Sequence, residues 1–114
     1  MACALAWVQR NATAEGLDPR SVTLAGQSAG ATLALSTTSA LVAGERACET
    51  PVPVPRAVVA FFPVVDMSMI APSLSGRLLV VPYADHVFDH PFGSPGGQIA
   101  RSALARFVQE YGRA

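Results

Sequence analysis

The sequence predicts an α/β protein with a mainly parallel, three-stranded sheet flanked by helices. Short apolar runs alternate along the chain with longer segments of helical spacing, which is the order typical of parallel sheets. The run at residues 57–62 is continuously apolar, as in a parallel strand that is buried on both faces. The chain has 114 residues, so we expect one small domain, residues 1–114.

The first half of the chain predicts a helix, a strand and a second helix. Apolar residues recur at helical spacing over residues 1–15, and Gly16 is expected to end that helix. A proline turn leads to the first strand, residues 21–25. Many Ala, Ser and Thr residues over 29–43 indicate a helix that lies close to the sheet. The stripe expected to face the core in the first helix is Leu5, Val8 and Ala12.

The second half predicts two further strands and a final helix. The strand at residues 57–62 is followed by a third apolar run at 77–81, and a loop with both histidines comes next. Ser94 and Pro95 are typical of an N-cap and a first helical residue. The following helix is expected to cover one sheet face with a stripe of Ile99, Ala103, Phe107 and Tyr111.

Composition excludes several classes of function. The formal net charge is zero, so nothing indicates binding to nucleic acid or to an anionic membrane. No apolar run approaches the roughly 20 residues of a membrane span, and the start lacks the features of a signal peptide, so we expect a cytoplasmic location. Cys3 and Cys48 have no metal-site spacing; we expect free, partly buried thiols and no metal, with a disulfide as the alternative.

The segment Gly26-Gln27-Ser28-Ala29-Gly30 lies between the first strand and the second helix. Gly-x-Ser-x-Gly in that position is typical of a nucleophile elbow, in which a strained serine projects its hydroxyl from a sharp turn. We expect the crowding at the turn to leave room only for hydrogen at Gly26 and Gly30. The alternative is a glycine-rich turn that only packs tightly.

Three candidate catalytic side chains follow the three expected strands. Ser28 comes after the first strand, Asp66 after the second and His86 after the third. Sites in open parallel sheets form beyond the carboxyl ends of the strands. If all three strands are parallel, the three side chains therefore share one edge of the sheet.

These stretches resemble the α/β-hydrolase family, in particular its carboxylesterase and acetyl- or feruloyl-esterase-like branch. The resemblance lies in GLDPRSVTLAGQSAGATLAL, AVVAFFPVVDMS and LLVVPYADHVFDHPFG. It implies that Ser28 is the nucleophile, that His86 is the general base, and that the Ala29 N–H is one oxyanion donor. His90 does not match the family position and is interpreted as a solvated loop residue.

The acid of the expected triad is less well defined. Glu45 and Glu49 follow the far end of the helix after Ser28, and Asp85 adjoins His86 too closely for good geometry. Asp66 is the best remaining candidate for the acid that would orient His86, but the role that we favour for it is a turn cap near the site.

The chain also departs from the family pattern. A βαβ unit that carries the acid needs roughly 30 residues, but residues 63–77 alone separate the last two expected strands. The early strands and the loop with the second oxyanion donor have no counterpart. The resemblance therefore implies an N-terminally truncated and internally deleted member, with weak or absent activity and with an open sheet edge through which a homodimer could form.

We therefore expect a serine hydrolase of carboxylesterase type that acts on a small-molecule ester and needs no cofactor. One alternative is a non-catalytic hydrolase fragment that needs a partner. The other is a small α/β module whose Ala29 and Gly30 N–H groups bind an anion.

Overall fold

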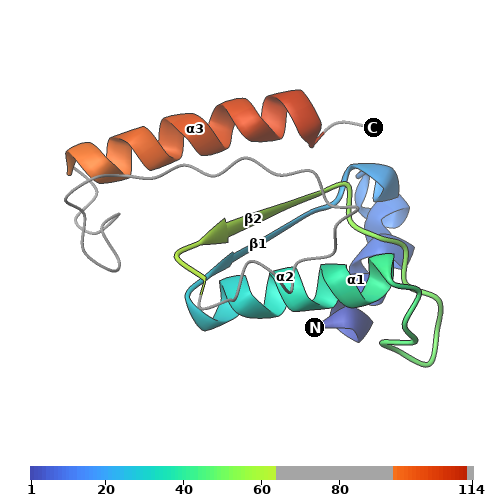
Figure 1. Cartoon of the computed structure of the whole chain (residues 1–114). Helices are drawn as coiled ribbons and strands as arrows, with labels where there is room; N and C mark the ends of the chain where they lie inside the picture. Colours follow the sequence, from blue (N-terminus) through green and yellow to red (C-terminus); the bar gives the residue numbers. More distant parts are fainter. Residues whose placement is uncertain (64–93, 113–114) are drawn as a thin grey trace.

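The computed structural model describes residues 1–63 and 94–112 (Figure 1). Its helices are α1 (Ala2–Asn11), α2 (Ala29–Val42) and α3 (Pro95–Tyr111), and its strands are β1 (Thr23–Gln27) and β2 (Ala57–Phe61). Two short 3₁₀ helices, η1 (Ala12–Glu15) and η2 (Pro19–Ser21), connect α1 to β1.

The described strands form a parallel pair, which confirms the predicted α/β class. The register runs from Thr23 opposite Ala57 to Gln27 opposite Phe61. Hydrogen bonds extend the pairing beyond both ends, from Arg56 N to Val22 O at 2.9 Å and from Ser28 N to Phe61 O at 3.0 Å. The predicted third strand, residues 77–81, lies outside the described residues.

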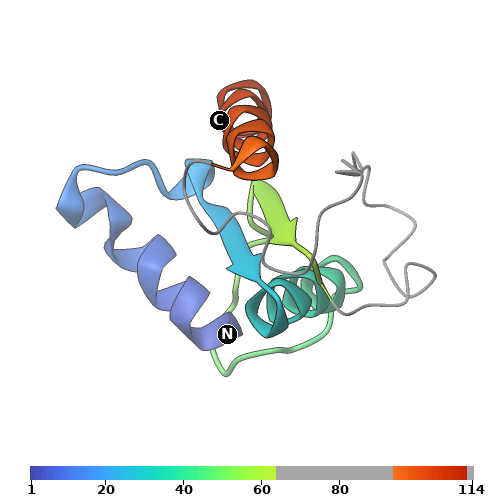
Figure 2. The ribbon, with the colours of Figure 1, turned by 90° about the vertical axis from the view of Figure 1, so that its left-hand side faces the viewer.

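Helices lie on both faces of the strand pair (Figure 2). α2 packs along β1 and β2, and α3 lies on the opposite face, where it contacts β2. α2 buries Ala31, Ala34 and Thr38. These small side chains recur on one side of the helix, so its axis can lie close to the sheet, as its composition predicted. The core of the described part consists mostly of alanines.

α1 differs in part from its prediction. Leu5 and Ala12 are buried, but Val8 is 41% exposed. The buried stripe instead includes Gln9, whose Nε2 donates to the carbonyl oxygen of Pro53 at 3.3 Å. Gly16 ends the helical segment as predicted: it has a φ of 72°, and its N–H donates to the carbonyls of the preceding 3₁₀ turn.

β1 begins two residues later than predicted and runs to Gln27. The reason is η2, which occupies the positions where the strand was expected to begin. Asp18 caps this turn by accepting from the Arg20 backbone N–H at 2.9 Å, and its carboxylate also pairs with the Arg20 guanidinium at 2.9 Å.

α3 begins as predicted. Ser94 is its N-cap and accepts from the Gly97 N–H at 3.0 Å, and Pro95 is the first helical residue. The buried side of the helix, however, is made by Gly97 and Ala100, while Ile99 is 49% exposed and Tyr111 37%. The buried positions therefore differ from the predicted stripe and are occupied by small residues, while Ala103 and Phe107 of the stripe are half-buried.

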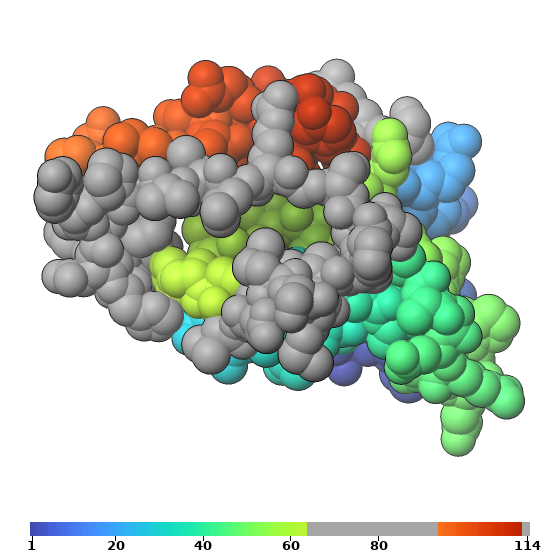
Figure 3. Space-filling view, viewed as in Figure 1, coloured from blue at the N-terminus to red at the C-terminus, as the bar shows by residue number. Residues whose placement is uncertain are grey.

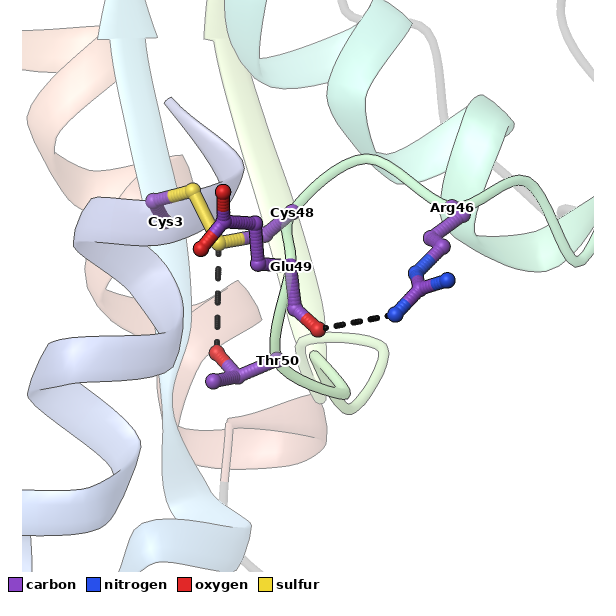
Figure 4. The surroundings of a disulfide bond; sticks show 5 residues. All are labelled: Cys3, Arg46, Cys48, Glu49 and Thr50. Atoms are coloured by element: carbon purple, nitrogen blue, oxygen red, sulfur yellow. Dashed lines mark hydrogen bonds between the residues drawn. A yellow bond between two sulfur atoms is a disulfide. The ribbon is translucent and has the colours of Figure 1, made fainter.

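The expectation of free thiols is wrong. Cys3 and Cys48 form a disulfide with a Cα–Cα distance of 5.3 Å (Figure 4). The loop after α2 returns to the start of α1, and this brings together two cysteines that are 45 residues apart. Disulfides persist mainly in oxidising compartments and are rare in the cytosol. The cytoplasmic location expected from the sequence stays a prediction. No helix in the described ranges is long and apolar enough to cross a membrane.

Candidate active site

Ser28 occupies the junction between β1 and α2. Its backbone has φ 50° and ψ −118°, a conformation that side-chain-bearing residues rarely adopt. Such a conformation costs of the order of 1–3 kcal/mol and persists only where the surrounding structure imposes it. The strained turn predicted from the sequence is therefore present at this serine.

The glycine before this turn is required by close packing. A Cβ at Gly26 would collide with the carbonyl group of Gly30 and lie 2.6 Å from the backbone nitrogen of Ala31. A Cβ at Gly30 meets no described atom within 4 Å outside its own helix. The crowding that we expected at both glycines is thus found at Gly26, and the expectation for Gly30 is wrong with respect to the described residues.

Hydrogen bonds hold the Ser28 backbone from both sides. Its N–H donates to the Phe61 carbonyl at 3.0 Å, and its carbonyl accepts from the N–H of Thr32 at 3.0 Å and from the Thr32 hydroxyl at 3.3 Å. The Ser28 side chain makes no capping hydrogen bond to α2, although serine is a preferred N-cap. The first turn of α2 therefore does not engage its hydroxyl.

A second strained residue lies at the end of the neighbouring strand. Phe62 has a φ of 38° and directly follows β2. This residue is not among the candidates that the sequence predicts. Its neighbour Pro63 gave no signal of it, because proline biases the preceding residue toward extended conformations.

A family model described as the alpha/beta hydrolase fold matches residues 1–88. The chain belongs to the alpha/beta hydrolase fold family. The matched range extends from α1 through β2 and includes Asp66 and His86, whereas α3 lies beyond it. No curated protein and no solved structure matches the chain significantly.

Two of the three triad residues that the hydrolase resemblance implied cannot be placed. Asp66 and His86 lie outside the described residues, so their convergence with Ser28 stays a prediction. Glu45 and Glu49 follow the far end of α2. This helix has 14 residues and is about 20 Å long, which separates both acids from Ser28 as expected.

The backbone of α2 supplies the other predicted group. Ala29 is the first residue of this helix, and the N–H groups of a first turn have no acceptor within the helix. The helix dipole adds partial positive charge at the same end. The Ala29 N–H is therefore at a place that favours negative charge next to Ser28.

Charged groups are absent from the described segments around this turn, residues 26–36 and 57–63. In the described part of the hydrolase chain, clear pKa shifts occur at Asp18 and Arg20, which lie before β1 and so at the opposite end of the strand from Ser28. No group of three His, Cys, Asp or Glu side chains in the described ranges could hold a metal ion.

Two of the hollows on the described surface are formed without Ser28. One, of about 430 Å³, lies under the loop around Cys48. The other, of about 540 Å³, lies between α1, η2 and the proline-rich segment before β2. Both are formed by segments away from the turn, so they add nothing to the site at Ser28.

Proposed function

We propose that this alpha/beta hydrolase is a serine hydrolase of carboxylesterase type with Ser28 as its nucleophile. The observation that carries the proposal is the backbone of Ser28, which is strained at a strand-to-helix junction while its side chain leaves α2 uncapped. A serine that serves only as a helix cap adopts extended backbone angles and bonds to the first turn. Ser28 does neither.

The proposed reaction uses the roles that the family resemblance implies for Ser28, Ala29, His86 and Asp66. The Ser28 oxygen attacks the ester carbonyl while its proton passes to His86, and the Ala29 N–H donates to the oxyanion that forms. His86 then protonates the departing alcohol, and water releases the acid from Ser28 by the same steps. Asp66 orients His86 in this proposal, and no metal or organic cofactor takes part.

A fluorophosphonate probe tests the proposal, because it modifies activated serines covalently. We expect labelling of the wild-type chain and its loss in Ser28→Ala and in His86→Ala. Ser36→Ala is the matched control, since Ser36 is an exposed serine on the same helix whose hydroxyl bonds to the carbonyl of Leu33. A folded wild-type chain that is not labelled would contradict the proposal.

The uncapped first turn of α2 also favours a second candidate, a module that binds an anion at the Ala29 and Gly30 N–H groups. Inorganic phosphate would then raise the melting temperature of the chain. We expect that rise to persist in His86→Ala if the function is anion binding, because this mode of binding needs no general base. A chain that is labelled by the probe and is not stabilised by phosphate contradicts this second candidate.

A further inference from the structure

Ser28 and Phe62 are the two non-glycine residues with positive φ in the described part of the chain, and each directly follows one of the two paired strands. The last register pair of the parallel strands is Gln27 with Phe61. Ser28 and Phe62 are the next residues of the two strands, and the hydrogen bond from Ser28 N to Phe61 O closes the pairing beside them. Both strained residues therefore lie at the same carboxyl edge.

The backbone of Phe62 also changes where its ring lies. Successive side chains of an extended strand point to opposite faces of the sheet. The rings of Phe61 and Phe62 instead lie with their centroids 6.4 Å apart and tilted by 58°, within the range of a direct aromatic contact. The positive φ thus gathers two aromatic rings at the end of β2.

A positive φ is costly for a residue with a bulky side chain, whereas glycine adopts the same backbone conformation without strain. Strained residues of this kind concentrate at ligand-binding and catalytic positions. Phe62 is also only half-buried, so part of the residue remains exposed at this edge of the sheet. The strain and the partial exposure together indicate a role in binding.

The described segments around this pair, residues 26–36 and 57–63, carry no charged side chain. The end of β2 reaches the surface close to the start of α2 (Figure 3). Leu33, on the second turn of α2, is 53% exposed, and no charged residue occurs in the described segments that surround Ser28. A ligand that binds here gains by burying hydrocarbon and has no charged group in these segments to pair with.

We propose that the rings of Phe61 and Phe62 form an apolar wall that binds the acyl group of the ester and thereby selects uncharged acyl chains longer than acetyl. This inference rests on the proposed function, since it concerns the same site. Phe62 binds and positions the acyl chain and takes no part in bond making. Its contribution therefore grows with the apolar area of the acyl chain.

Hydrolysis of p-nitrophenyl acetate and p-nitrophenyl butyrate tests the wall. The two esters share their leaving group and differ by two methylenes, each of which is worth about fourfold when fully buried. We expect wild type to favour butyrate in kcat/KM, and we expect Phe62→Ala to reduce the butyrate-to-acetate ratio by about tenfold. Most of the change should lie in KM for butyrate.

Phe62→Gly separates the ring from the backbone, because glycine accepts positive φ but has no side chain. We expect the same loss of the ratio in Phe62→Gly as in Phe62→Ala. A normal ratio in Phe62→Gly together with a reduced one in Phe62→Ala would assign Phe62 a backbone role and overturn the wall. Trp7→Ala is the matched control, since Trp7 is an aromatic residue on α1 that is 61% exposed. The butyrate-to-acetate ratio of this variant should equal that of wild type.

Two further outcomes separate this inference from the proposed function. Turnover that depends on Ser28, with an unchanged ratio in both Phe62 variants, would overturn the wall and leave the hydrolase proposal standing. An unchanged butyrate-to-acetate ratio in both Phe62 variants, together with a changed preference among acetate esters of different alcohols, would place the rings on the alcohol side. That result would overturn the acyl assignment. A folded chain with neither labelling nor turnover would overturn both proposals.

Discussion

The backbone N–H of Ser28 donates to the carbonyl of Phe61 at 3.0 Å and so fixes the strained turn to the neighbouring strand. The bond adds one step to the parallel ladder beyond the last register pair. Because both partners lie at the carboxyl edge, this bond ties the backbone of Ser28 to the end of β2. The position of the serine therefore depends on two strands rather than on the turn alone.

Gly26→Ala should destabilise the fold. The new methyl group would collide with the backbone of Gly30 and Ala31, which cannot move without distorting the start of α2. Overpacking of this kind typically costs about 1–3 kcal/mol, and we expect the upper part of that range because backbone atoms are involved. Urea denaturation followed by circular dichroism measures the change.

Gly30→Ala is the matched control for Gly26→Ala. Its methyl group meets no described atom within 4 Å outside the helix, and alanine is a better helix former than glycine by about 1 kcal/mol. We expect unchanged or higher stability. Equal losses in the two variants would contradict the close approach of Gly26 to α2.

Replacement of both disulfide cysteines, Cys3→Ser with Cys48→Ser, should lower the free energy of unfolding by about 2–4 kcal/mol. The bond closes a long loop, so its loss gives the unfolded chain more conformational freedom. Dithiothreitol should lower the stability of wild type by a similar amount and leave the double variant unchanged. A wild-type chain with two titratable thiols under non-reducing conditions would argue against the bond.

Ser94→Ala should cost about 1 kcal/mol, because the hydroxyl accepts from the Gly97 N–H at the start of α3. Ser102→Ala is the control, since Ser102 is exposed in the middle of the same helix. Alanine favours the helix there, so the control should retain full stability. The difference between the melting temperatures of the two variants measures how much the Ser94 cap contributes to stability.

Asp18 should make a small, pH-dependent contribution to stability. The side-chain hydrogen bond from Arg20, together with the Arg20 backbone N–H, lowers the pKa of Asp18 below its ordinary value of 3.8. A carboxyl group whose pKa is lowered by folding stabilises the fold fully above 3.8, and this contribution disappears as the pH falls through the lower, folded value. Asp18→Asn should therefore be less stable than wild type near neutral pH, and the difference should vanish in acid. A difference that persists in acid would indicate a cause other than the charge.

The sequence predicted best those features that depend on neighbouring residues. The N-cap at Ser94, the end of the first helical segment at Gly16 and the strained turn at Ser28 each follow from local chemistry, and the structure has all three. The parallel pairing of β1 and β2 followed from the alternation of elements and from the continuous apolar run of the second strand.

The errors arose where distant segments meet. Nothing near Cys3 or Cys48 indicates that the loop after α2 returns to α1, so the disulfide could not be read from spacing. The buried sides of α1 and α3 depend on which residues approach neighbouring segments, whereas apolar spacing alone favoured Val8 and Ile99. The strain at Phe62 is imposed by the fold and has no local signature.

The disulfide between Cys3 and Cys48 closes a covalent ring that contains β1, Ser28 and α2. A protease that cuts the chain once inside this ring releases no fragment, because both pieces stay joined through sulfur. Nicked and intact molecules would then migrate alike on a non-reducing gel and separate only after reduction. The segment with the candidate nucleophile thus stays attached to the rest of the molecule after a single cleavage.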